Sequence, residues 1–208
     1  AELVEFDKVI AVAGTHGKTS TSSLLTELLQ PDGAGAFLGG ILKKGNTNFY
    51  PPEQGQPIVV EADEFDRSFL NFHPDIAIVT STDADHLDIY GKGEELEKTF
   101  EQFAQLVSEN GHLILEEGVL KSTEFKSKVW RYGFSNGNDF QPKNIKVEDG
   151  KFHFDLVTPW GELEGWQLPL PGRYNVLNAT AAIAAAMIAD LEFVIDNSEL
   201  LRKVDTAV

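Results

Sequence analysis

The sequence predicts an α/β fold in which helices flank a mostly parallel sheet, with a small antiparallel β appendage. Up to about residue 115, short apolar runs alternate with stretches of helical spacing. Apolar runs of this kind are typical of parallel strands that are covered on both faces. From about residue 128 to 168 the pattern changes to short alternating runs joined by turn residues, such as those at 148–150. This second pattern favours antiparallel strands and predicts the appendage.

The elements follow from these patterns in chain order. Short apolar runs predict strands at residues 8–13, 57–62, 75–81 and 112–115. Apolar residues at helical spacing predict helices at residues 18–29, 94–107, 174–189 and 198–204. Glycine and proline make residues 31–40 loop-like, and the polar stretch 45–57 is expected to be an exposed excursion.

Composition limits the function classes. The 208 residues, 42% of them hydrophobic, are enough for one domain with a real core. No apolar run approaches the ~20 residues of a membrane helix, and there are no cysteines for disulfides or thiolate metal sites. A net charge of −16, with 17 scattered Lys and Arg, argues against a nucleic-acid surface. We therefore expect a soluble, cytoplasmic protein. Because the chain starts at Ala1, we also expect an excised piece of a longer protein.

A glycine-rich loop, Gly14-Thr15-His16-Gly17-Lys18-Thr19, follows the first predicted strand and opens the first predicted helix. Glycines allow a tight turn whose backbone N–H groups face an anion, and the helix N-terminus adds partial positive charge. Lys18 would reach the β- and γ-phosphates of a nucleotide, and the Thr19 hydroxyl would bind Mg²⁺. The loop is a shorter P-loop, since the general pattern has glycine where this chain has Val12. The alternative is an ordinary glycine turn capped by Thr or Ser.

Two acidic clusters lie at the ends of predicted strands: residues 61–64 (EADE) and 83–88 (DADHLD). Ligands of open α/β sheets bind at the carboxyl ends of the strands. Thr19 and Glu61, with an imidazole from His86, suit Mg²⁺ that bridges the protein to nucleotide phosphates. Each cluster taken alone could also be a solvated acidic loop, and a lone histidine such as His86 often has no ligand role.

Four segments together carry a family resemblance: GTHGKTST, VVEADEFDRSF, STDADHLDIYG and PGRYNVLNATAA, in this order and at sensible spacing. They resemble the signatures of the central ATP-binding domain of the Mur ligases, over about residues 9–190. Within this family, the chain looks most like the branch that joins L-alanine to UDP-N-acetylmuramate. The resemblance implies that the whole of residues 1–208 is the central domain. An N-terminal uridine-nucleotide domain and a C-terminal domain would be absent.

The resemblance implies an ATP- and Mg²⁺-dependent ligase that works through an acyl phosphate, with UDP-N-acetylmuramate and L-alanine as substrates of the full-length enzyme. Lys18, Glu61 and His86 would be its catalytic residues. Thr19 and Glu61 would hold one Mg²⁺, and His86 with Glu61 a second. The residues expected to contact ATP are Gly14, Thr15, His16, Gly17, Lys18, Thr19, Ser20, Asn175 and Asn178.

The last two of these, Asn175 and Asn178, match the family residues that flank adenine, although Asn175 could instead cap its helix. Tyr174 stands where the family commonly has histidine, and its aromatic ring could stack on the base. By the same resemblance, a Mur ligase domain alone should not ligate, because the covering domain is missing.

Two other functions stay open. One is a ligase that recycles murein tripeptide onto UDP-N-acetylmuramate, which shares the GTHGKT and EADE segments. The other is a nonenzymatic P-loop switch, in which nucleotide hydrolysis drives a conformational change. A requirement of ATP turnover for a carboxylate cosubstrate would separate an enzyme from a switch.

Overall fold

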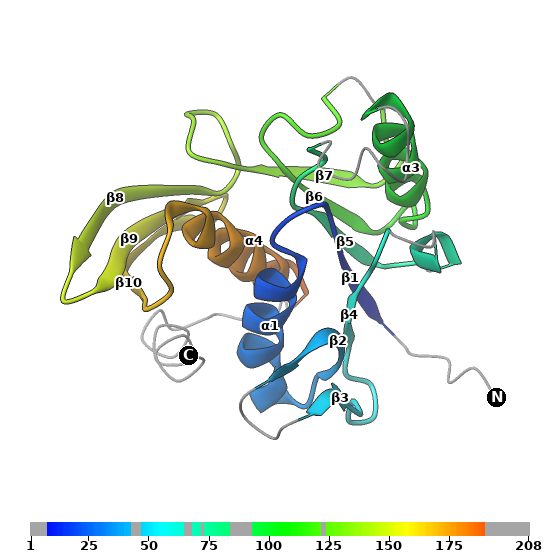
Figure 1. Cartoon of the computed structure of the whole chain (residues 1–208), viewed down its shortest axis with the longest axis horizontal. Coiled ribbons are helices and arrows are strands. Elements are labelled where there is room, and N and C mark those ends of the chain that lie inside the picture. The colour runs from blue at the N-terminus through cyan, green and yellow to red at the C-terminus, as the bar shows by residue number, and fades with distance from the viewer. Residues whose placement is uncertain are drawn as a thin grey trace.

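The computed structural model describes residues 8–42, 47–64, 68–71, 73–83, 93–121 and 124–189. Its centre is a seven-stranded sheet with the order β3-β2-β4-β1-β5-β6-β7 (Figure 1). The strands are β1 Val9–Ala13, β2 Gly35–Leu42, β3 Thr47–Tyr50, β4 Ile58–Glu61, β5 Ile76–Val79, β6 His112–Glu116 and β7 Lys128–Tyr132. All neighbouring pairs are parallel except β2 with β3. The predicted α/β fold with a mostly parallel sheet is confirmed.

Helices cover both faces of this sheet. On one face lie α1 (Lys18–Leu29) and α4 (Arg173–Ala189), which run beside each other in Figure 1. The other face is covered by α3 (Gly93–Gln105) and the 3-10 helix η2 (Ser68–Asn71). A further 3-10 turn, η1 (Gln30–Asp32), follows α1. The predicted helix at 198–204 lies outside the described residues.

The alanine-rich sequence of α4 explains how closely it packs against α1 and the sheet. Ala181, Ala182, Ala184 and Ala185 have no exposed surface. Small side chains let two helices approach closely, and alanine has the highest helix propensity. The first turns of α4 therefore lie against the glycine loop that opens α1, where Gly17 faces Asn178.

A separate antiparallel sheet packs beside α4 (Figure 1), with the order β10-β9-β8. Its strands are β8 Gln141–Glu148, β9 Lys151–Thr158 and β10 Gly161–Leu168. The sequence predicts that the appendage begins near residue 128, but β7 pairs in parallel with β6 and belongs to the main sheet. As an edge strand, β7 is only half buried. Its alternating pattern therefore resembles that of an antiparallel strand.

The prediction of a loop at 31–40 and an excursion at 45–57 is wrong in part. Residues 35–42 form β2, which pairs with β4 on one side and with β3 on the other. Ala36 and Leu38 are buried while Phe37 is exposed, so the period-two pattern of a strand is present between the glycines. Glycine has a low strand propensity, but the hydrogen bonding of β2 to strands on both sides stabilises the strand in spite of it. Within the described residues, no helix is long and apolar enough to cross a membrane.

The contact between Gly17 and Asn178 can be tested by substitution. Gly17 has a φ of +80°, and an added Cβ would lie within 3.0 Å of the Asn178 Oδ1 atom. We expect Gly17→Ala to lower the free energy of unfolding by about 2–4 kcal/mol, from the left-handed backbone and from the steric clash together. Urea unfolding followed by circular dichroism measures this loss.

Gly55→Ala is the matched control. Gly55 also has a φ of +80°, but an added Cβ meets nothing within 4 Å. Its substitution should cost only the backbone term, about 1–2 kcal/mol. Equal losses in the two variants would contradict a close approach of the loop to α4.

Candidate functional site: a glycine loop at the ends of four strands

The loop between β1 and α1 is shaped by two glycines. Gly14 has a φ of +136°, and a Cβ there would overlap the Thr80 hydroxyl. Gly17 is the N-cap of α1, in the left-handed conformation, and no side chain caps the helix. The alternative of a turn capped by Thr or Ser is therefore wrong. The first-turn N–H groups of α1 have no capping side chain, an arrangement that suits an anion.

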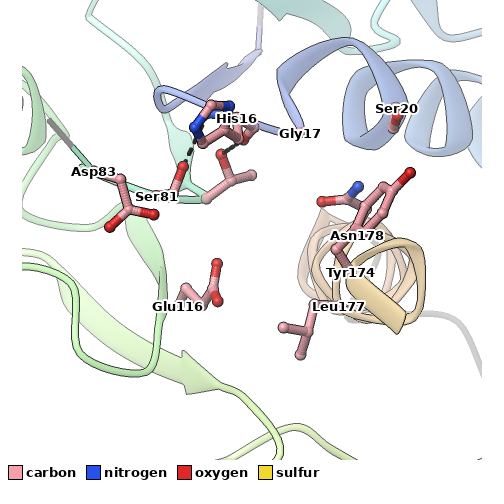
Figure 2. Close-up of a pocket in the computed structure, with 10 residues that line it drawn as sticks. His16, Gly17, Ser20, Ser81, Asp83, Glu116, Tyr174, Leu177 and Asn178 are labelled. Carbon is pink, nitrogen blue, oxygen red and sulfur yellow. Dashed lines mark hydrogen bonds between the residues drawn. The ribbon is translucent and has the colours of Figure 1, made fainter. Parts of the chain in front are cut away.

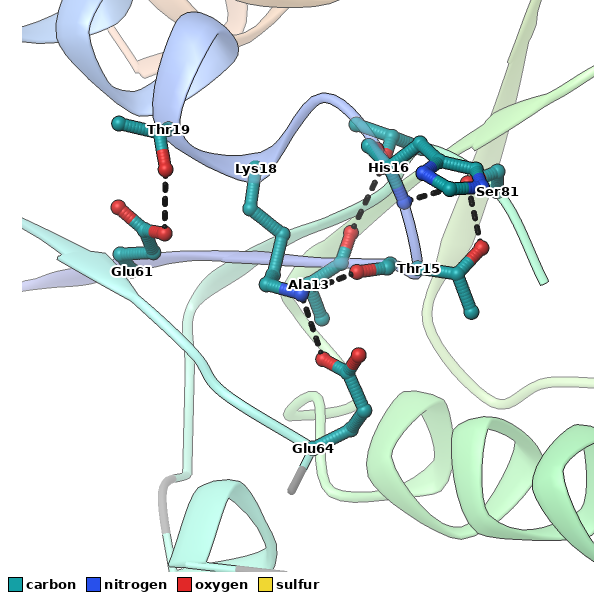
Figure 3. A network of polar contacts seen from close by, with 10 residues as sticks. Ala13, Thr15, His16, Lys18, Thr19, Glu61, Glu64 and Ser81 are labelled. Atoms are coloured by element: carbon teal, nitrogen blue, oxygen red, sulfur yellow. Dashed lines mark hydrogen bonds and ion pairs between the residues drawn. The ribbon is translucent and has the colours of Figure 1, made fainter. Parts of the chain in front are cut away.

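The end of β5 fixes this loop in place. Thr15 donates its backbone N–H to the Ser81 carbonyl at 3.0 Å, and the two hydroxyls are 2.8 Å apart. The His16 N–H donates to the Ser81 hydroxyl at 2.9 Å (Figure 3). The Thr80 hydroxyl donates to the His16 carbonyl. Sequence reasoning gave Thr80 and Ser81 no role. Their position as the last two residues of a predicted strand, at the ligand-binding edge of the sheet, is the signal that the sequence offers.

Lys18 points back over the loop (Figure 3). Its ammonium donates to the Gly14 carbonyl at 2.7 Å and to the Glu64 carboxylate at 2.8 Å. The Glu64 side chain is only 4% exposed, so the pair is largely removed from water. Breaking such a pair leaves an uncompensated charge, which is costly unless another ion replaces the lost partner. A phosphate group is an anion that could take this place.

Thr19 and Glu61 lie next to each other beside the loop, at the start of α1 and the end of β4. The Thr19 hydroxyl donates to Oε1 of Glu61 at 2.7 Å. Oε2 of Glu61 accepts from the Gly39 N–H at 2.9 Å and from the Ser22 hydroxyl at 3.4 Å. The structure thus brings together two of the three predicted metal ligands. The third, His86, lies outside the described residues.

These two groups fit Mg²⁺. It prefers oxygen ligands, and a nucleotide-bound Mg²⁺ takes one or two protein ligands and fills its other positions with phosphate and water. In the described part of the chain, no cluster of three or more His, Cys, Asp or Glu could hold a metal by itself. A site made of Thr19 and Glu61 would therefore depend on a bound phosphate.

The two predicted asparagines of α4 form a chain of hydrogen bonds. Asn178 Nδ2 donates to Asn175 Oδ1 at 3.0 Å, and Asn175 Nδ2 donates to the Pro171 carbonyl at 2.7 Å. Asn175 is thus engaged at the start of its helix, while Asn178 lines a cavity. The exposed ring of Tyr174 lines the same cavity.

The cavity has a volume of about 510 Å³ and opens between the glycine loop, the ends of β5 and β6, and α4 (Figure 2). This is within the range of small-molecule sites. The lining residues are His16, Gly17, Ser20, Thr80, Ser81, Asp83, Glu116, Tyr174, Leu177 and Asn178. Four of the residues predicted to contact a nucleotide line this cavity: His16, Gly17, Ser20 and Asn178.

Glu116 is a cavity residue that sequence reasoning missed. Burial, together with the nearby carboxylates of Asp83 and Glu117, raises its pKa to about 7. A signal was present, because the pair Glu116-Glu117 ends a predicted strand just as the two recognised acidic clusters do. The pair lies outside the four segments that carry the family resemblance.

Comparison with known proteins extends this description. The family model of the Mur ligase middle domain matches residues 12–186. A protein of Christiangramia forsetii named UDP-N-acetylmuramate–L-alanine ligase is 46% identical over 180 residues, which are 86% of this chain and 38% of that protein. A protein of the same name from Porphyromonas gingivalis strain W83 is 41% identical over 89% of this chain and 42% of its own length. The chain thus spans about two fifths of the length of these relatives.

Solved structures share the fold. The UDP-N-acetylmuramate:L-alanyl-gamma-D-glutamyl-meso-diaminopimelate ligase of Neisseria meningitides has a TM-score of 0.80 and 24% identity, over 98% of this chain and 67% of that one. The UDP-N-acetylmuramate-alanine ligase of Thermotoga maritima has a TM-score of 0.77 and 23% identity, over 96% and 44%. From the family match over most of its length and the relatives above 40% identity, we conclude that this chain belongs to the Mur ligase family and that residues 12–186 correspond to its middle domain.

Proposed function

We propose that this chain provides the ATP and Mg²⁺ site of a ligase that joins L-alanine to UDP-N-acetylmuramate. The observation that carries the proposal is the meeting of Lys18, Thr19 and Glu61 at one end of the sheet, around an uncapped helix N-terminus. The names of the relatives at 46% and 41% identity support the choice of substrates. We place the reaction in the cytoplasm.

The chemistry is phosphoryl transfer from ATP to the substrate carboxylate, followed by displacement of phosphate by the amine of alanine. In the first step, positioning and charge neutralisation dominate catalysis. The loop from Gly14 to Ser20 binds the phosphates through its backbone, and Lys18 exchanges Glu64 for phosphate oxygens. Thr19 and Glu61 would hold Mg²⁺, which would supply positive charge next to the phosphates. His86 is proposed as a ligand of a second Mg²⁺ with Glu61.

Asn178 is proposed to contact the adenine, because it lies in the cavity next to the loop, and Asn175 orients it through their hydrogen bond. The ring of Tyr174 lies where it can cover one face of the base. These contacts are the same in the ground state and the transition state, so they contribute to ATP affinity more than to the chemical rate.

The reaction itself is tested with a protein that carries this chain within the full length of its relatives. ATP, Mg²⁺, UDP-N-acetylmuramate and L-alanine should give UDP-N-acetylmuramoyl-L-alanine, detected by mass spectrometry. Product from the murein tripeptide but not from L-alanine would favour the recycling ligase. ATP hydrolysis without any dependence on a carboxylate substrate would favour a nucleotide switch. The 208-residue chain alone should bind Mg²⁺-ATP weakly and form no product.

Lys18→Ala is expected to abolish ligation in that full-length protein. The ammonium contacts the loop at the Gly14 carbonyl, and its loss should remove several kcal/mol of transition-state stabilisation, so that kcat falls by about 10²–10³ or more. Steady-state phosphate release measures this. A matched control is Lys126→Ala, which removes an exposed lysine whose described ion pair, with Glu109, is also on the surface. Full activity of Lys18→Ala would contradict the P-loop assignment.

Glu61→Gln is expected to weaken ATP binding in the presence of Mg²⁺ by about tenfold and to change little in its absence, because the carboxylate acts through the cation. Titration of the 208-residue chain with ATP, with Mg²⁺ or with EDTA, measures the difference. Asp63→Asn removes the same charge two residues away, at an exposed position, and should leave the Mg²⁺ dependence intact. An equal effect of the two substitutions would show that the total negative charge near the loop, and not the Glu61 carboxylate itself, determines Mg²⁺-dependent binding.

A further inference from the structure

We propose that Glu116 recognises the base of the nucleotide, donating a hydrogen bond to a ring nitrogen of adenine and accepting one from its exocyclic amine. The inference rests on the proposed function, because it requires a nucleotide whose phosphates occupy the glycine loop. It adds a specificity-determining residue to the adenine site, on the wall opposite Asn178.

The position of Glu116 in the sheet is suitable for this role. Glu116 ends β6, which is separated from β1 by β5 alone, whereas Glu61 ends β4 on the other side of β1. Neighbouring strands are about 4.8 Å apart, so the ends of β1 and β6 are separated by about 10 Å. A ribose with its 5′-phosphate can span this distance. The metal-binding carboxylate and the base-binding carboxyl group would therefore lie on opposite sides of the phosphate loop.

The cavity walls also favour a flat, partly apolar group at this point. Figure 2 shows the carboxyl group of Glu116 pointing into the cavity, with Leu177, Tyr174 and Asn178 across from it on α4. Leu177 and the ring of Tyr174 offer apolar contact to a base, and Asn178 offers an amide. Such sites combine an apolar lining with a few placed polar groups.

The carboxyl group of Glu116 lacks a hydrogen-bond partner among the described residues. Among them, none forms a hydrogen bond or salt bridge with its carboxyl group. The neighbouring Glu117 instead accepts hydrogen bonds from the Asn138 side chain at 2.8 Å and from the Ser135 N–H at 3.1 Å. Half-buried polar groups normally have partners, and a ligand in the cavity would supply them.

The surroundings of Glu116 favour its neutral, protonated form. The titratable groups around it are the carboxyls of Asp83 after β5 and Glu117, the Tyr132 hydroxyl on β7, His16 on the glycine loop and Tyr174 on α4. No described Lys or Arg is among the groups that shift the pKa of Glu116. Burial and the Asp83 carboxylate raise this pKa to about 7, so most molecules keep the proton at pH 6 and about half keep it at pH 7.

A neutral carboxyl group has one donor and one acceptor side by side, and adenine presents a matching acceptor and donor at its amino edge. An ionised carboxylate can only accept hydrogen bonds. Its second oxygen would then place a lone pair against the lone pair of the adenine ring nitrogen, which is unfavourable. The proton on Glu116 is thus part of the recognition. ATP affinity should be highest below the pKa of Glu116 and should fall as the pH rises above it.

The experiment measures Mg²⁺-ATP affinity of the 208-residue chain from pH 6 to 8.5, for the wild type, Glu116→Gln and Glu116→Ala. At pH 8 about one tenth of wild-type molecules would be competent, so the wild-type Kd should rise about tenfold relative to pH 6. Glutamine keeps the donor and the acceptor but cannot titrate, and should bind within about threefold of the wild type at pH 6 without this loss. Alanine should bind about tenfold more weakly than the wild type at pH 6. The titration of ATP itself is common to all three proteins.

A second measurement replaces ATP with purine riboside triphosphate, which lacks the exocyclic amine. The wild type should bind this analogue several-fold more weakly than ATP, and Glu116→Ala should bind the two equally. An equal preference for ATP in the wild type and the alanine variant would overturn the role of Glu116, as would the same pH profile in the wild type and the glutamine variant. No ATP binding by the wild type at any pH would instead overturn the proposed function, and this inference with it.

Discussion

The close approach of two neighbouring elements to the backbone of the glycine loop is the constraint on which the rest of the site depends. Gly14 lies against Thr80 and Ser81, and Gly17 lies against Asn178, at separations that leave no room for a Cβ. The loop therefore touches the end of β5 on one side and α4 on the other. Without these two contacts, the strand ends and α4 would not enclose a common cavity, and Lys18 would not be aimed along the loop.

Negative charge is the second organising feature. The chain carries a net charge of −16, and its acidic residues at strand ends, Glu61, Glu64, Asp83 and Glu116, surround the place proposed for a polyanion. Glu61, Glu64 and Glu116 are each compensated differently. Glu64 pairs with Lys18, Glu61 accepts three hydrogen bonds, and Glu116 keeps its proton more readily than an ordinary glutamate. An acidic site can accept a nucleotide when its charges are distributed over such separate arrangements and a cation accompanies the phosphates.

The fold was largely predictable from sequence because apolar runs and helical spacing report burial directly. The helix from Lys18 to Leu29 was predicted with its observed bounds. The incorrect predictions concern segments whose structure depends on pairing with strands that are distant in sequence. β2 contains three glycines, which predict a loop. β7 has the alternating pattern of an antiparallel strand because an edge strand in a parallel sheet has one face less buried. In the site, Lys18, Thr19 and Glu61 could be found because their chemistry and spacing are distinctive. Ser81 and Glu116 have only their position at a predicted strand end as a signal, and the fold is needed to show that the ends of β5 and β6 meet the loop.

The three hydrogen bonds of Glu61 also have a consequence for how tightly a small cation can be held. One oxygen of the carboxylate is tied to the Gly39 N–H of β2 and to Ser22, while the other faces the Thr19 hydroxyl. The rotamer is therefore set by folding, before any ion arrives. A flexible glutamate would lose about 1 kcal/mol or more of conformational entropy on coordinating a metal. Here that ordering has already occurred, and the oxygen that faces Thr19 is presented as a single, preoriented ligand.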